Sequence, residues 1–256
     1  MPEDEVVQAA GLELRNLSRA FGGLKAVNGV SLSVQPGERR ALIGPNGAGK
    51  TTLFNLISGE IRPTEGSIAF QGADVTALPP HQRAARGIAR TFQITRLFAS
   101  LTVFENMLLG CEALDPRKFT LHRPLSSFSD LTERAGALLE AFGLWPSRTE
   151  AAGNLSYGNQ RMLEVALSMA GRPALLLLDE PMAGLSAAER SLMLRHLDRL
   201  DRAIAVLMIE HDMDVAFGFA ETVTVLDQGR VLFEGSKDEV SANPAVQRIY
   251  LGVQDA

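Results

Sequence analysis

The chain has 256 residues, of which 46% are hydrophobic and 21% are charged, and its formal net charge is -5. This composition is ordinary for a globular protein and excludes a wholly disordered chain, a collagen and a small domain held by disulfides. The net negative charge does not suggest non-specific binding to nucleic acid. The single cysteine, Cys111, excludes a disulfide within the chain.

No apolar run approaches the roughly 20 residues needed to cross a bilayer. Three of the first five residues are acidic, and the N-terminus lacks the apolar core of a signal peptide. We therefore expect a cytoplasmic protein that associates with a membrane only through a partner.

The first half of the chain begins with strands and then becomes helical. Apolar patterning predicts strands at 12–17, 30–34, 39–43 and 66–71. The third strand runs into a glycine-rich segment, and a helix is predicted from there to about Ser58, with Gly59 as its end. From Pro79 to Ala152 the pattern is helical and irregular.

The second half alternates strands with helices. Ser156 opens a helix that ends near Gly171, and the capping box Ser186–Glu189 opens another that runs to about Arg202. A second capping box, Ser236–Glu239, precedes a C-terminal helix. Strands are predicted at 175–178, 204–209, 222–226 and 230–234. The alternation predicts an α/β fold with a mainly parallel sheet, an antiparallel sheet from the early strands and an inserted helical subdomain.

The segment Gly44–Thr51 matches the pattern G-x-x-x-x-G-K-[ST]. Its glycines allow backbone N–H groups to surround a phosphate, and the N-terminus of the following helix adds positive potential. Lys50 supplies a charge for the outer phosphates, and Thr51 supplies a hydroxyl for Mg²⁺. The alternative is a chance glycine-rich turn, and the strand before it and the helix after it argue against that.

Two carboxylates, Asp179 and Glu180, follow the apolar run Leu175–Leu178. Ligands bind at this end of the strands in an open α/β sheet. Asp179 would hold Mg²⁺ through a water, and Glu180 would act on the water that attacks the γ-phosphate, as a general base or as its anchor.

Ser156 is an N-cap. The same helix N-terminus also offers N–H groups to an anion, and Gly158 permits close approach of the backbone.

With these motifs the chain resembles, over essentially its full length, the ATP-binding subunits of ABC transporters. The resemblance implies a P-loop NTPase (RecA-like) core in which Gly44–Thr52 is the Walker A motif and Leu175–Glu180 the Walker B motif. Leu155–Gln160 resembles the signature usually written LSGGQ, and Ala183–Ser186 occupies the D-loop.

The resemblance implies ATP and Mg²⁺ as cofactors. Glu180, His211 and Gln93 would be the catalytic residues, and Thr51, Gln93 and Asp179 would hold the metal. ATP would be contacted by an adenine-stacking Phe21, by Gly44, Pro45, Asn46, Gly47, Ala48, Gly49, Lys50, Thr51 and Thr52, and by Ser156, Gly158 and Asn159 of a second subunit.

The sequences at 87–93, 96–98 and 101–106 resemble those of branched-chain amino acid importer ATPases, and the LivG-like subunits rather than the LivF-like ones. The segments 209–213 and 249–252 agree. The resemblance implies an importer ATPase but leaves its solute open among branched-chain amino acids, other amino acids, amides, urea and aromatic acids. An exporter subunit is one alternative. A soluble ABC ATPase acting on DNA or ribosomes is another, but the chain lacks the long inserts, tandem domains and basic arms usual there.

The implied partners are a second ATPase subunit, two membrane permease subunits and, indirectly, a periplasmic or extracellular solute-binding protein. The ATPase pair would be a paralogous heterodimer, or a homodimer in isolation, at the inner face of the cell membrane; nucleic acid is not expected. Within one ATP-binding domain, 1–92 and 172–235 would form the nucleotide-binding core, 93–171 the helical subdomain and 236–256 a helical tail.

Three residues depart from the family pattern. Tyr157 and Asn159 replace Gly and Gln of the signature, and Ser186 replaces the common D-loop Asp. We expect the Tyr157 ring to lie beside the nucleotide of the partner subunit. Without the family context, Phe21 is best explained as a core aromatic and His211 as a loop histidine. The arginines at 83, 86, 90 and 96 are interpreted as a solvated face.

Overall fold

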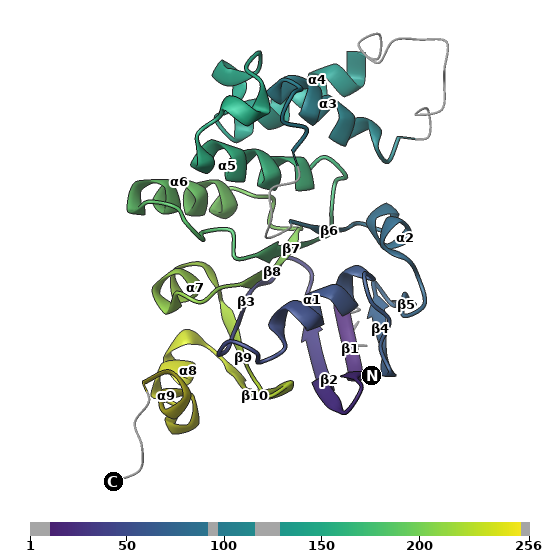
Figure 1. Cartoon of the computed structure of the whole chain (residues 1–256), viewed down its shortest axis with the longest axis vertical. Coiled ribbons are helices and arrows are strands. Elements are labelled where there is room, and N and C mark those ends of the chain that lie inside the picture. The colour runs from purple at the N-terminus through teal and green to yellow at the C-terminus, as the bar shows by residue number, and fades with distance from the viewer. Residues whose placement is uncertain (1–10, 92–96, 116–128, 252–256) are drawn as a thin grey trace, which may run out of the picture.

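The computed structural model describes residues 11–91, 97–115 and 129–251. Its larger sheet has six strands in the order β10-β9-β3-β8-β7-β6. The strands are β3 (Arg39–Ile43), β6 (Ile88–Arg90), β7 (Leu175–Asp179), β8 (Ala205–Ile209), β9 (Thr222–Asp227) and β10 (Arg230–Gly235). Neighbouring strands run parallel except β9 and β10, which form a hairpin. The predicted mainly parallel sheet is therefore confirmed (Figure 1).

The second sheet is antiparallel, with the order β2-β1-β4-β5. Its strands are β1 (Leu12–Phe21), β2 (Leu24–Val34), β4 (Glu65–Phe70) and β5 (Ala73–Asp74). Leu12, Leu14 and Leu17 of β1 are almost fully buried, while the residues between them are more exposed. This alternation buries one face of the sheet, as expected for an antiparallel sheet with a solvated side.

Helix α1 (Lys50–Ser58) lies between the two sheets (Figure 1). Its Leu53 and Phe54 are fully buried in one core with the inner face of the antiparallel sheet. Leu175 and Leu177 of β7 face this core, while Leu176 and Leu178 face a second core formed with the helices on the other side of the sheet. A strand buried on both faces is apolar throughout, which explains the unbroken leucine run.

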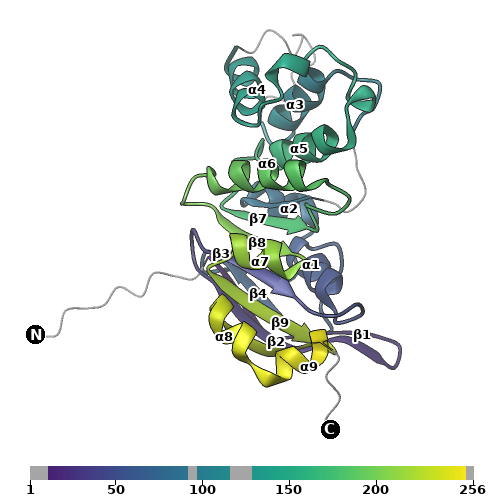
Figure 2. The ribbon, with the colours of Figure 1, turned by 90° about the vertical axis from the view of Figure 1, so that its left-hand side faces the viewer.

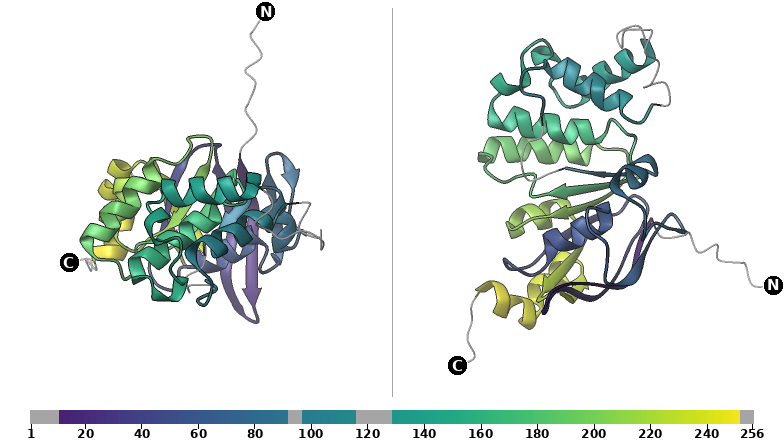
Figure 3. Two further views of the ribbon diagram at one scale, coloured as in Figure 1. Left: turned by 90° about the horizontal axis from the view of Figure 1, so that it is seen from above. Right: turned by 45° about the vertical axis from the view of Figure 1, so that its right-hand side comes forward.

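Helices α3 (Val103–Glu112), α4 (Ser129–Ala141) and α5 (Tyr157–Ser168) gather at one end of the molecule (Figures 2 and 3). Helix α6 (Ala187–Asp198) lies next to α5 in the views of Figures 1 and 2. The remaining elements are α2 (Pro80–Ala85), η3 (Trp145–Ser147), η4 (Ala152–Asn154), α7 (Met213–Phe219), α8 (Lys237–Ala242) and α9 (Pro244–Leu251). Both predicted capping boxes are present, at Ser186 and Ser236.

Several element boundaries differ from the predictions. Strand β6 lies within the segment 79–152, for which only helical structure is predicted. Its three residues pair with β7 at the edge of the sheet. Three residues are too few to show a period of two, so only the partner strand defines this strand. The first two strands are longer than predicted, helix α7 was missed, and the C-terminal helical region is divided at Asn243, before Pro244. A proline readily starts a helix but does not continue one.

The interpretation of the arginine stretch as a solvated face is wrong for Arg83 and Arg90. Arg83 is 1% exposed, and its guanidinium donates to the carbonyls of Leu56 and Ile57 at the C-terminal end of α1, at 2.6 and 2.7 Å. It also bonds two further backbone carbonyls, those of Thr76 and Leu78. A cation is favourable at a helix C-terminus, where carbonyls lack partners within the helix. Arg86 is exposed, as predicted.

Replacing Arg83 by Met is therefore expected to lower the free energy of unfolding by about 3 kcal/mol or more, because four backbone carbonyl oxygens, two of them in buried hydrogen bonds, lose a charged donor. Urea unfolding followed by circular dichroism measures this. Arg86→Met is the matched control, since it removes an exposed arginine three residues away. Equal stability of the two variants would contradict the capping role of Arg83.

Candidate functional site

The loop between β3 and α1 has the backbone geometry of a phosphate-binding loop. Gly44 and Gly49 have φ values of 154° and 102°. A Cβ atom at Gly44 would lie 2.1 Å from the carbonyl oxygen of Leu226, and one at Gly49 would lie 2.3 Å from that of Ala26. No larger residue fits at either position, so the loop stays tightly wound at the N-terminus of α1.

Lys50 lies inside this loop. It is 5% exposed, and its ammonium group donates to the carbonyl oxygens of Gly44 at 2.5 Å and Pro45 at 3.0 Å. Burial lowers the pKa of Lys50, while the carboxylates of Glu180 and Asp179 act in the opposite direction. Lys50 forms no direct ion pair in the described part of the chain. Its ammonium group can therefore exchange the two neutral carbonyls for charged phosphate oxygens.

A cleft of about 310 Å³ opens over the loop. It is lined by Ala26, by residues 46–52 and by Glu180 and His211. The structure thus brings two of the predicted catalytic residues to the predicted phosphate-binding loop. His211 Nε2 and Glu180 Oε1 are 2.6 Å apart. Glu180 also has a φ of 49°, an uncommon backbone conformation for a residue other than glycine, of a kind that clusters at functional sites.

Asp179 is buried at the end of β7, and its Oδ2 accepts a hydrogen bond from Arg90 Nη2 at 2.9 Å. Burial raises the pKa of Asp179, and the Arg90 guanidinium opposes this rise. The other oxygen, Oδ1, is buried without a hydrogen-bond partner among the described residues. A buried acceptor without a donor suits a metal-bound water, and the exposed Thr51 hydroxyl is a second oxygen ligand of the type that Mg²⁺ prefers. The residues present therefore fit a Mg²⁺ ion. Gln93 lies outside the described residues.

The signature residues do not line this cleft. Ser156 caps the N-terminus of α5 by accepting a hydrogen bond from the backbone N–H of Asn159 at 3.3 Å. Gly158 is buried there, and a Cβ atom on it would lie 2.2 Å from Glu189 Oε1, so a larger residue would displace the Glu189 side chain. Ser156 and Asn159 are exposed and available to a second molecule.

Tyr157 lies against the D-loop of its own chain. Its hydroxyl donates to the carbonyl oxygen of Ala183 at 3.2 Å, and a Cβ atom on Gly184 would lie 3.0 Å from its ring. The ring remains 47% exposed. Its contact with a nucleotide of a partner subunit stays a prediction. Ser186 caps α6 and forms the predicted capping box with Glu189, so the Asp-to-Ser departure keeps helix initiation.

Phe21 is not a core aromatic, since it is 48% exposed at the end of β1. The guanidinium of Arg19 lies 4.6 Å from its ring centroid. An exposed ring backed by a cation leaves one face available for stacking. Its role with adenine stays a prediction.

Glu210 is a further residue of the site, and none of the sequence motifs assigns it a role. It is 4% exposed and accepts a hydrogen bond from the backbone N–H of Met182 at 3.2 Å. Burial raises the pKa of Glu210 from its ordinary value of 4.5 to about 7. The carboxyl thus links the segment after Glu180 to the segment that carries His211. The sequence places Glu210 between an apolar strand and His211, which indicates a position near the site. The sequence does not indicate that the Glu210 side chain is buried.

The raised pKa of Glu210 predicts a pH dependence of stability. The neutral carboxyl is favoured in the folded state, so its contribution is complete below pH 4.5 and is lost as pH rises to about 7. Relative to the wild type, Glu210→Gln is therefore expected to become more stable over this range, by roughly 3 kcal/mol. Urea unfolding at several pH values measures this, with Glu140→Gln, an exposed glutamate, as control. Parallel pH curves for all three proteins would contradict it.

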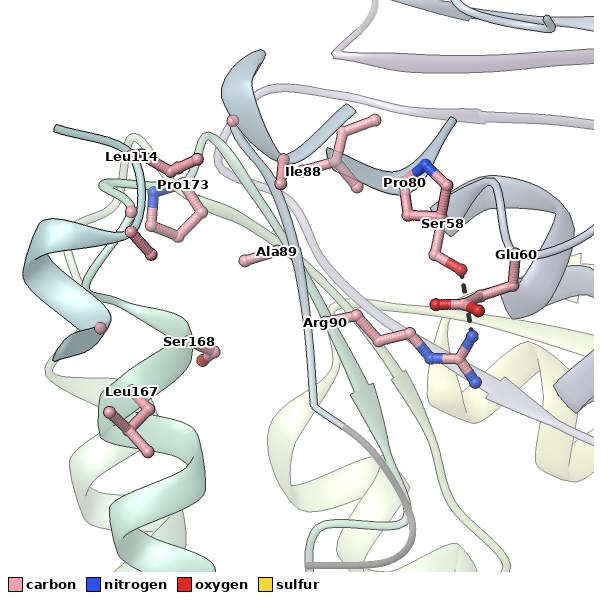
Figure 4. A pocket seen from close by; sticks show the side chains of 15 residues that line it. Ser58, Glu60, Pro80, Ile88, Ala89, Arg90, Leu114, Leu167, Ser168 and Pro173 are labelled. Atoms are coloured by element: carbon pink, nitrogen blue, oxygen red, sulfur yellow. Dashed lines mark hydrogen bonds between the residues drawn. The ribbon is translucent and has the colours of Figure 1, made fainter. Parts of the chain in front are cut away.

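A second groove, of about 320 Å³, lies between α1, α2 and β6 on one side and the ends of α3 and α5 on the other (Figure 4). Its lining is mainly apolar and includes Ile88, Ala89, Leu114, Leu167 and Pro173.

Within the described ranges, the structure contains no helix long and apolar enough to cross a membrane.

The fold and the site together define a P-loop ATPase, and the family model described as "ABC transporter" matches residues 27–183. The chain belongs to this family and is an ATP-binding ATPase of the ABC type. It is 40% identical to the high-affinity branched-chain amino acid transport ATP-binding protein LivG of Escherichia coli (strain K12), over 94% of this chain and 97% of that protein. It is 38% identical to BraF of Pseudomonas aeruginosa, a protein with the same description, over 94% and 97%.

Solved structures agree with this assignment. The ADP conformation of an ATP-binding cassette of an ABC transporter matches with a TM-score of 0.85 and 31% identity, over 95% of this chain and 99% of that one. The dimeric structure of a bacterial ABC transporter cassette matches with a TM-score of 0.76 and 25% identity, over 88% and 98%. The predicted family and fold are thereby confirmed.

Proposed function

We propose that this chain is the ATP-hydrolysing subunit of an importer for branched-chain or related amino acids. The observation that carries the catalytic part is the 2.6 Å contact between Glu180 and His211 at the edge of the phosphate-binding cleft. A carboxylate and an imidazole in this position can orient a water molecule and accept its proton. The solute class is supported by the names of LivG and BraF, which are branched-chain amino acid transport proteins.

ATP would bind with its phosphates on residues 44–52 and its adenine against Phe21. Lys50 would leave its two carbonyl partners for the outer phosphates. Thr51, Gln93 and Asp179 would hold Mg²⁺, which supplies charge stabilisation to the phosphates when bound. Catalysis here needs positioning and charge rather than a covalent intermediate.

The γ-phosphate would be enclosed only when a second ATPase subunit docks. Ser156, Gly158 and Asn159 lie outside the cleft of their own chain and, in our proposal, contact ATP bound to the partner. Two ATP molecules would then lie in a head-to-tail dimer with a paralogous subunit, or with a second copy in isolation. A related bacterial cassette has a dimeric structure with bound ADP and Pi, which supports this arrangement. Loss of the γ-phosphate removes contacts across the interface, so hydrolysis would open the dimer.

Two permease subunits would receive this motion at the inner face of the membrane. The groove between β6 and the ends of α3 and α5 is our candidate for their docking site, because its lining is apolar and β6 leads directly to Gln93. We propose the same subdivision of the chain as above: a nucleotide-binding core (1–92 and 172–235), a helical subdomain (93–171) and a helical tail (236–256). A solute-binding protein would act indirectly, through the permeases.

The test is reconstitution in lipid vesicles with candidate permeases, a candidate second ATPase and a candidate solute-binding protein. We expect ATP-dependent uptake of radiolabelled leucine and stimulation of ATP hydrolysis by the loaded binding protein. Urea, an amide and an aromatic acid are offered in parallel. Uptake of one of these in place of leucine would overturn the solute class, and outward movement would overturn import.

A further inference from the structure

The side chain of Arg90 belongs to two sites at once. It lines the groove between β6 and the ends of α3 and α5, where Figure 4 shows it beside Ser58. Its guanidinium also pairs with Asp179 in the phosphate-binding site, at 2.9 Å. Arg90 stands at the end of β6, and its side chain is 8% exposed, so the connection runs through the protein interior.

The guanidinium is held in place by helix α1. Nη1 donates to Asn55 Oδ1 at 2.6 Å and to Ser58 Oγ at 3.1 Å, while Nη2 donates to Asp179. The ring centroid of Phe54 is 5.8 Å from the guanidinium carbon. A planar fork with several donors can span acceptors on two elements, which a lysine ammonium cannot do in the same geometry. Arg90 therefore ties the end of β7 to the helix that follows the phosphate-binding loop.

The two carboxylate oxygens of Asp179 differ in their contacts. Arg90 holds Oδ2, and Oδ1 has no hydrogen-bond partner in the described part of the chain. A buried carboxylate with one oxygen held by a fixed donor presents the other in a defined direction. The free oxygen is the one available to a metal-bound water.

We propose that Arg90 is a positioning residue that orients Asp179 for the metal of bound nucleotide, and that occupation of the groove acts on the nucleotide site through it. This inference rests on the proposed function and deepens it, because it names the side chain that connects the permease groove to the metal site. A segment docked in the groove would press on the Arg90 side chain. Any shift of that side chain is passed to Asp179, since the guanidinium is bonded to it.

A guanidinium also repels a nearby metal ion. If this repulsion were the main effect of Arg90, removal of the arginine would tighten metal binding. If instead Arg90 orients the Asp179 carboxylate and favours its charged form in the buried site, removal of the arginine would weaken metal binding. The sign of the change therefore distinguishes the two roles.

The first experiment measures binding of Mn²⁺ and ATP by electron paramagnetic resonance in a Glu180→Gln background, where the nucleotide persists. Arg90→Met is expected to weaken Mn²⁺ binding by about 10- to 100-fold, the usual effect of losing a residue that orients a metal ligand. Arg90→Lys should fall between Met and the wild type. Arg86→Met, an exposed arginine of the same stretch, should leave binding unchanged. Unchanged or tighter binding in Arg90→Met overturns the positioning role.

The second experiment fills the groove covalently. Leu114 lines it and is 41% exposed, so Leu114→Cys can be labelled with a bulky aromatic maleimide. The native Cys111 is buried, and treated protein without the new cysteine is the control. We expect the label to change the Mn²⁺ dissociation constant several-fold with Arg90 present and to have no effect with Arg90→Met. The same change in both backgrounds, or none in either, overturns the connection.

Neither measurement needs a permease or a transported solute. A wrong solute class would leave both results intact. Failure of the Glu180→Gln protein to bind Mn²⁺ and ATP at all would overturn the proposed function and this inference with it.

Discussion

Replacing Glu180 by Gln is expected to reduce the rate of ATP hydrolysis by about 10²- to 10⁴-fold, the usual contribution of a general base. Glu180 bonds His211 at 2.6 Å and faces the cleft over Lys50. Glutamine keeps the size of the side chain but cannot accept the proton of the attacking water. ATP affinity should change little, because the phosphates are bound by the loop and by Lys50.

Phosphate release measures turnover, and filter binding of radiolabelled ATP measures affinity. Glu140→Gln, on the exposed face of α4, is the control for the same chemical change away from the site. Vigorous hydrolysis by the Glu180→Gln protein would refute its assigned role. A parallel loss of ATP binding would show instead that the carboxylate supports the loop.

Replacing Lys50 by Ala is expected to weaken ATP binding by roughly 30- to 140-fold. A hydrogen bond to a charged group contributes about 2 to 3 kcal/mol, and each 1.4 kcal/mol is a factor of ten in affinity. The Lys50 ammonium is bonded to the carbonyls of Gly44 and Pro45 within the loop, and it would exchange these two partners for phosphate oxygens when the nucleotide binds. Hydrogen bonds to the charged phosphate oxygens are stronger than those to neutral carbonyls.

Isothermal titration with ATP at fixed ionic strength measures the loss, since surface charges are screened by salt. Lys237→Ala removes an exposed lysine at the start of α8 and is the charge-matched control. Equal affinities for the two variants would mean that the backbone N–H groups hold the phosphates without the ammonium. Circular dichroism checks that Lys50→Ala remains folded.

The sequence by itself determined the features that depend on neighbours along the chain. The phosphate-binding loop follows from glycines and one lysine at fixed spacing, and the helix starts at Ser156, Ser186 and Ser236 follow from side chains that accept a nearby N–H. The buried strand β7 follows from four leucines and the acid that comes after them. Such features are local, so residue type and order suffice to predict them.

The tertiary structure alone decided what depends on residues far apart in the chain. Arg83 and Arg90 look like surface charges in the sequence, but helix α1 and β7 supply carbonyls and a carboxylate that make their burial favourable. Strand β6 exists because β7 lies beside it. Glu180 and His211 meet because β7 and β8 run parallel and end at the same edge of the sheet, a consequence of strand order that no run of neighbouring residues contains.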